Sequence, residues 1–128
     1  MSYCFSKQLD CGFEEAISRV TAELQKEGFG ILSEIDVTAK LKEKIDVDFR
    51  PYRILGACNP AYAHKALQAE PNIGTMLPCN VVVQVTDDGR TEVSAIDPVA
   101  SMQAVNNPGL EPIAGDIRAK LSAVIDRL

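Results

Sequence analysis

The stretch YRILGACNPAYAHKALQAEPNIGTMLPCNVVVQV, residues Tyr52–Val85, decides how the rest of the chain is arranged. Two Cys-Asn pairs frame it. Cys58-Asn59-Pro60 closes one apolar run and opens a helical pattern, and Cys79-Asn80 opens a second apolar run. Because asparagine is a common N-cap and proline suits the first helical position, the first pair predicts a strand that passes directly into a helix. The two junctions form the candidate functional site.

Outside this stretch the apolar period switches repeatedly between two and about 3.6 residues, which indicates alternating strands and helices. Strand patterns cover 2–9, 31–35, 52–57, 81–85 and 91–96, and helical patterns cover 10–27, 37–45, 60–70, 98–105 and 113–128. The order β-α-β-α-β-α-β-β-α-α, with a hairpin through Asp87-Asp88-Gly89-Arg90, predicts an α+β fold. We expect one domain, 1–128, with helices packed against a mixed or antiparallel sheet.

Several local features carry more specific expectations. Gly28 is expected to end the first helix in the left-handed conformation, and Asp36 to cap the second helix. That second helix, 37–45, is expected to cover the sheet with its apolar stripe. The consecutive valines 81–83 predict a central strand with both faces covered. Gly115 indicates either a close backbone approach or a helix that starts late, at Asp116.

Composition bounds the class of function. The chain has 128 residues, 46% hydrophobic and 24% charged, with a net charge of −5, which fits one soluble globular domain. Nucleic acid and anionic membrane surfaces are excluded as expected partners because no basic cluster is present. We read no signal peptide and no membrane span, so we expect a cytoplasmic protein whose four cysteines are thiols.

The residue types at the two junctions are compatible with metal binding, thiol redox chemistry or binding of a small ligand. Cys58 precedes a predicted helix N-terminus, which stabilises a thiolate, and Cys79 lies beside it if the two strands pair. His64, the only histidine, is the available base. Together they could bind a soft metal ion, form a reversible disulfide or hold a small electrophilic ligand. Packing as small buried hydrophobes is the favoured explanation of both cysteines, and a surface or helix-face position is the favoured explanation of His64.

Three more residues complete the candidate set. Asn59 and Asn80 are either ligand contacts or residues that satisfy the backbone, as a helix cap and in a loop. Arg53 is either a carboxylate or phosphate contact or a solvent-facing edge residue. The sequence contains no C-x-x-C, G-x-G-x-x-G, Walker or G-x-S-x-G motif, so it assigns no structural zinc site, no nucleotide site and no catalytic residue.

The phrases Gly28–Pro60, IGTMLPCNVVV (Ile73–Val83) and SAIDP (Ser94–Pro98) resemble the DUF302 family of small bacterial and archaeal proteins. The resemblance covers nearly the whole chain, and GACNP and LPCNVVV are its most specific phrases. It implies a compact α+β domain that forms a homodimer, and a function that the family name records as unknown. It also implies that Cys58-Asn59-Pro60 and Pro78-Cys79-Asn80 belong to the family pattern.

Three functions are open at this point. The first is an accessory domain that binds a small molecule or a metal ion between the Asn59 helix and the segment Ile73–Asn80. The second is a thiol-dependent redox or transfer enzyme that uses Cys58 and Cys79. The third is a structural domain for dimerisation or interaction. The sequence identifies no cofactor.

Overall fold

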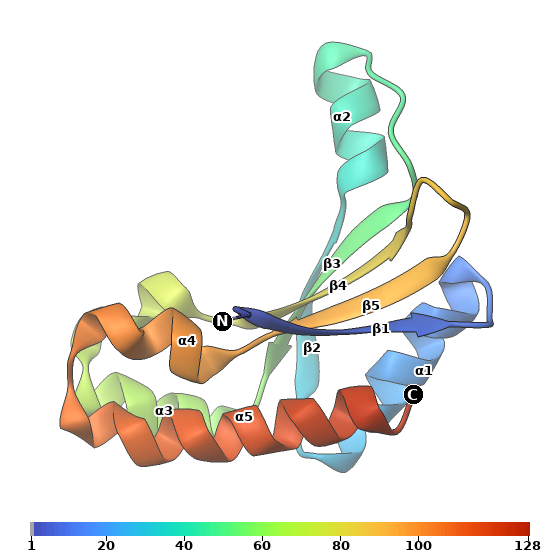
Figure 1. The fold of residues 1–128 in the computed structure, drawn as a ribbon. Helices are drawn as coiled ribbons and strands as arrows, with labels where there is room; N and C mark the ends of the chain where they lie inside the picture. The colour runs from blue at the N-terminus through green and yellow to red at the C-terminus, as the bar shows by residue number, and fades with distance from the viewer. Residues whose placement is uncertain (1) are drawn as a thin grey trace.

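The computed structural model describes residues 2–128 and contains one antiparallel sheet of five strands in the order β1-β5-β4-β3-β2 (Figure 1). The strands are β1 (Cys4–Leu9), β2 (Gly30–Asp36), β3 (Tyr52–Cys58), β4 (Cys79–Val85) and β5 (Thr91–Ile96). The helices are α1 (Phe13–Lys26), α2 (Val37–Ile45), α3 (Pro60–Ala69), α4 (Pro98–Met102) and α5 (Glu111–Asp126). The predicted α+β class and element order are confirmed.

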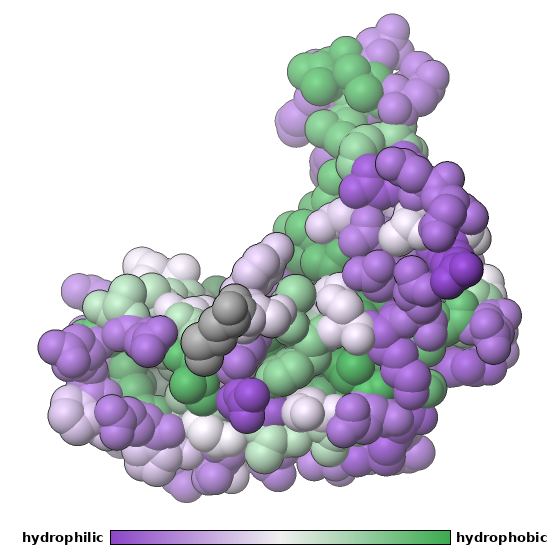
Figure 2. All heavy atoms as spheres, viewed as in Figure 1, coloured by the Kyte–Doolittle hydropathy of each residue, from purple (hydrophilic) through white to green (hydrophobic). Residues whose placement is uncertain are grey.

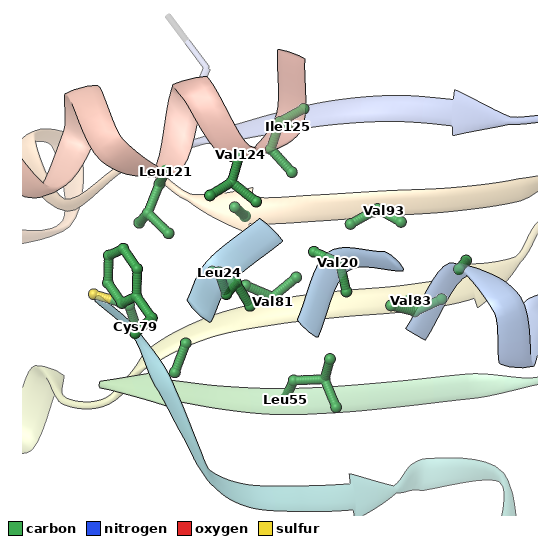
Figure 3. Packing of buried hydrophobic residues seen from close by; sticks show 14 of the residues in the cluster. Val20, Leu24, Leu55, Cys79, Val81, Val83, Val93, Leu121, Val124 and Ile125 are labelled. Atoms are coloured by element: carbon green, nitrogen blue, oxygen red, sulfur yellow. The ribbon is translucent and has the colours of Figure 1, made fainter. Parts of the chain in front are cut away.

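One face of the sheet carries the main core. Side chains at alternating positions of β4 and β5 are buried, as expected where one face of an antiparallel sheet packs against helices. α1 and α5 contact this face and bury Val20, Leu24, Leu121 and Val124 against it. Figure 3 shows these helical side chains directed toward Val81, Val83 and Val93.

The end of α1 follows its prediction closely. Gly28 has φ +89°, and the backbone N–H groups of Gly28 and Phe29 donate to the carbonyls of Gln25 and Leu24. Phe29 is thereby folded back into the core, where it is 2% exposed. This is the hydrogen-bond pattern of a helix C-terminus that is closed by a glycine in the left-handed conformation.

α2 does not cover the sheet, so that prediction is wrong. The helix begins at Val37 directly after β2 ends at Asp36, and no connecting residues allow the chain to turn back over the sheet. Instead α2 projects beyond the sheet as an arm, and none of its residues is buried (Figure 1). Asp36 caps it as expected, accepting a 2.9 Å hydrogen bond from Ala39 N–H. Figure 2 shows hydrophobic residues gathered on one side of the arm.

The second face of the sheet is open. β4 is the central strand, as expected, but only one of its faces is covered: Asn80 is exposed and Val82 is half-buried. A hollow of about 430 Å³ lies over this face. The prediction that both faces of the valine run are covered is therefore wrong, because α1 and α5 both lie on the other face.

α3, α4 and the beginning of α5 pack together at one end of the sheet (Figure 1). A short 3-10 helix, Pro71–Met76, buries Ile73 in a small second core with Ala66 and Leu110. α5 already begins at Glu111, and a β-carbon added to Gly115 would meet nothing within 4 Å. Gly115 therefore marks neither a close approach nor a late helix start. Within residues 2–128, no helix has the length and apolar character needed to cross a bilayer.

Candidate functional site

The pairing of β3 with β4 brings the two Cys-Asn junctions together. The strands are antiparallel neighbours, so the end of β3 meets the beginning of β4, with Ala57 opposite Cys79 and Gly56 opposite Asn80. Cys58 passes into α3 through Asn59, and Cys79 follows the cis Leu77-Pro78 peptide. Residues far apart in sequence thus share one corner of the molecule.

A small cavity lies at this corner, with a volume of about 30 Å³. Its walls come from the end of β3, from α3, from the segment before β4, and from α4 and α5. The lining is almost entirely apolar and consists of Phe29, Ala57, Cys58, Asn59, Tyr62, Ala63, Ala66, Leu77, Pro78, Cys79, Pro98, Met102, Ile113, Ala114 and Ile117. The volume is that of about two water-sized probes, so the cavity accepts only a small group without rearrangement.

Both cysteines of the junctions contribute to the cavity wall, and their exposure differs. Cys79 is 9% exposed and Cys58 is half-buried. Burial in apolar surroundings, with a smaller contribution from neighbouring Cys58, raises the pKa of the Cys79 thiol to about 11. In Figure 3 Cys79 lies on the same side of β4 as Val81 and Val83, toward Leu121 of α5. Cys79 is therefore a protonated thiol at neutral pH, a poor nucleophile.

Asn59 occupies the N-cap position of α3, but its side chain makes no capping hydrogen bond. Its amide nitrogen instead donates to the carbonyl oxygen of Glu27 over 3.1 Å. A β-carbon on Gly28 would lie 3.1 Å from the same nitrogen, so the glycine leaves room for this contact. The predicted helix start is confirmed, and the predicted capping role of the side chain is wrong.

Gly56 allows the segment before β4 to lie close to β3. A β-carbon at this position would lie 2.8 Å from Cγ of Pro78 and would also clash with Oγ of Ser33. Since β-carbons are not found so close to other heavy atoms, only glycine fits here without displacement of a neighbour. The glycine of the GACNP phrase is thus explained by a contact with the proline of the LPCN phrase.

The other three candidate residues lie outside the cavity lining. Asn80 is exposed, on the face of the sheet opposite Cys79. His64 is exposed on α3, while the residues of α3 that line the cavity are Tyr62, Ala63 and Ala66. The hypothesis that His64 acts as a base beside the thiols therefore has no geometric support.

Arg53 lies near the opposite end of β3 from Cys58. Its guanidinium forms ion pairs with Glu14, Glu34 and Asp36 at 3.0 to 3.6 Å, and its carbon Cζ lies 5.3 Å from the centre of the Phe13 ring. Three carboxylates already occupy the positions that an anionic ligand would need. Arg53 lies on β3, an interior strand, and its side chain is 19% exposed, so the alternative of a solvent-facing edge residue is wrong. It links β2 and β3 to α1, and this geometry gives no support to the ligand contact suggested for it.

A metal site has no set of ligands in the described part of the chain. Among residues 2–128, no three His, Cys, Asp or Glu side chains lie close enough to hold an ion. Cys58 and Cys79 supply two soft ligands, and structural zinc sites use four. The corner therefore suits a small molecule that packs against its apolar wall better than it suits a metal ion held by the two thiols.

Asp97 is the residue that the sequence analysis missed. It is 3% exposed, accepts hydrogen bonds from the backbone N–H groups of Val99 and Ala100, and forms an ion pair of 3.1 Å with Nε of Arg118. It holds α4, and with it Pro98 and Met102, over the cavity. The signal was present in the phrase SAIDP, because aspartate followed by proline is a typical helix start.

Comparison with known proteins places the whole chain in one family. A family model described as "Domain of unknown function DUF302" matches residues 5–128. The chain is also similar to a crystal structure of an uncharacterized conserved protein DUF302 from Bacillus stearothermophilus, with 36% identity and a TM-score of 0.92 over 99% of this chain and 98% of the other. A comparison with curated proteins finds no match. The chain therefore belongs to the DUF302 family, as its junction phrases predicted.

Proposed function

We propose that this chain is an accessory domain that binds a small molecule in the cavity at the two Cys-Asn junctions. The observation that carries the proposal is the cavity itself, which is lined by several segments spread along the chain between Phe29 and Ile117. Apolar cavities with convergent walls are the usual setting of small-ligand sites. Its volume of about 30 Å³ limits the buried part of the ligand to a few heavy atoms unless a wall residue moves.

Native mass spectrometry of freshly purified protein tests this function. We expect a mass excess that disappears when the same sample is denatured. Ala63→Val adds two methyl groups to the cavity wall and should abolish the excess. Ala119→Val makes the same change at an exposed position of α5 and should retain it. An apo mass for the unmodified protein would contradict the proposal.

The thiol-dependent enzyme has less support. Its two cysteines are neighbours in the wall of one cavity, as it requires, but the pKa of Cys79 is raised to about 11. A catalytic thiol is usually activated by a lowered pKa. Rapid alkylation of Cys79 in the native protein at pH 7 would restore this reading.

A structural role in dimerisation is the second candidate function, and one observation favours it. Exposed apolar side chains gather along β2, at the end of α2 and just after it: Leu32 is 67% exposed, Ile35 45%, Ile45 63% and Val47 42%. In a monomer these apolar side chains stay in contact with water, whereas a second copy of the chain packed against them would bury them.

Sedimentation equilibrium separates the two candidates. If the arm is a dimer interface, Ile45→Ser should weaken self-association at least tenfold. Leu67→Ser removes a leucine that is 43% exposed on α3 and should leave self-association unchanged. A monomer at high concentration, before any substitution, would contradict the dimerisation role and leave the cavity proposal untouched.

A further inference from the structure

A larger hollow at the surface adjoins the apolar cavity. This outer hollow has a volume of about 320 Å³ and shares four wall residues with the cavity: Leu77, Pro78, Cys79 and Met102. Its remaining wall includes Thr75, Asn80 and Ser101. At the second Cys-Asn junction, Cys79 therefore lines both the inner cavity and the outer hollow, whereas Asn80 lines only the outer hollow of these two.

Met102 is the shared wall residue with the most flexible side chain. It is half-buried at the last position of α4, a helix of only five residues, and it also lines a third hollow of about 370 Å³ on the side of Gln103 and Glu111. A methionine side chain is unbranched and has several accessible rotamers. A different rotamer of Met102 would therefore join the 30 Å³ cavity to the outer hollow without movement of the backbone.

The outer hollow has a mixed polar and apolar lining that contains no charged residue. The hydroxyls of Thr75 and Ser101 donate to the backbone carbonyls of Asn72 and Pro98, so their oxygens remain free to accept. Asn80 is exposed and offers both an amide donor and an amide acceptor. A charged group would find no counter-ion among these residues, whereas a neutral hydrogen-bonding group would find partners.

We propose that the ligand is a small neutral amphiphile, with a short apolar tail in the inner cavity and an uncharged hydrogen-bonding head beside Asn80. This assignment rests on the proposed function, because it requires that the inner cavity binds a ligand. It adds the chemical class of the ligand, its orientation and the path past Met102.

Titrations with four probes test the assignment, monitored by the methyl resonances of Met102 and of the alanines in the cavity wall. Xenon represents a tail alone. 1-Butanol, butylammonium and butyrate carry tails of similar length with a neutral, a positive and a negative head at pH 7. We expect saturable shifts with xenon and with 1-butanol, and binding of each ion at least about tenfold weaker than that of 1-butanol, because its charge has no partner in the hollow.

Two variants locate the head group. Asn80→Ala should weaken 1-butanol binding about fivefold, the usual value of one hydrogen bond, and leave xenon binding unchanged. Gln103→Ala makes a matched amide deletion in the neighbouring hollow and should change neither. Equal affinity for 1-butanol, butylammonium and butyrate would overturn the inference. So would a loss of 1-butanol binding in Gln103→Ala and not in Asn80→Ala. Absence of xenon binding would overturn the proposed function itself.

Discussion

The side-chain amide of Asn59 donates a 3.1 Å hydrogen bond to the backbone carbonyl of Glu27, the residue that ends α1. This bond fastens the junction between β3 and α3 to a helix end that lies 32 residues earlier in the chain. Asn80, the matching residue of the second junction, is exposed on the open face of the sheet. The two Cys-Asn pairs therefore use their asparagines differently.

Replacement of the two asparagines should separate these roles. Asn59→Ala leaves a half-buried carbonyl without its donor and should lower the free energy of unfolding by about 1–3 kcal/mol. Asn80→Ala removes an exposed side chain and should change it by less than about 0.5 kcal/mol. Urea denaturation of the two variants measures the difference. Equal losses would show that Asn59 does not hold the end of α1.

Gly56→Ala should destabilise the fold. The new methyl group would lie 2.8 Å from Cγ of Pro78, whose ring cannot rotate away, so the segment before β4 must shift. We expect a loss of about 1–3 kcal/mol, the usual cost of overpacking. The double variant Gly56→Ala with Ser33→Ala removes the clash with the serine and should recover only part of the loss. Full recovery would mean that Pro78 adapts without cost.

Gly115→Ala should have the opposite effect. Gly115 lies inside α5, and a β-carbon at this position meets nothing within 4 Å. Alanine restricts the unfolded chain and suits a helix, so we expect a gain of about 0.5–1 kcal/mol. Thermal unfolding should show a higher midpoint. A decrease would indicate that α5 needs the flexibility of glycine at this position.

Asp97→Ala should loosen α4. The variant loses the cap of α4 and leaves Arg118 without its carboxylate, and the expected loss is about 1–3 kcal/mol. Asp97→Asn keeps a capping oxygen and should lose less. Arg118→Ala should cost about 1 kcal/mol or less, because the arginine side chain is 50% exposed. If all three variants unfold at the same urea concentration as the parent, α4 is held by its apolar contacts alone.

The raised pKa of Cys79 predicts a dependence of stability on alkaline pH. The thiol has a pKa of about 11 in the folded chain, against a reference value of 9.0. The folded state therefore holds this proton more tightly than the unfolded state. Its contribution to stability is complete below pH 9 and is lost as the pH rises through 11.

Cys79→Ala provides the comparison for this effect. The variant removes the titrating group, so its free energy of unfolding should fall less between pH 9 and pH 11 than that of the parent. Other groups titrate in the same range in both proteins and cancel in the difference. Parallel pH profiles would show that Cys79 is not buried as the fold places it.

The elements themselves followed from local sequence. Gly28 ends α1 and Asp36 caps α2 because a left-handed glycine and a capping carboxylate act on backbone groups within a few residues. The strand-to-helix change at Cys58-Asn59-Pro60 is equally local. The order of strands and helices could therefore be predicted, and so could the proximity of the two junctions once β3 and β4 were assumed to pair.

What only the tertiary structure decided depends on groups that are distant in the chain. The partner of Asn59 is a carbonyl of α1, and the face of α3 that turns toward the cavity excludes His64 because Tyr62, Ala63 and Ala66 occupy it. Sequence periodicity predicts that a helix has an apolar stripe, but not which surface the stripe will meet. The stripe of α2 meets no part of this chain's own core, because β2 leads into the helix without a turn.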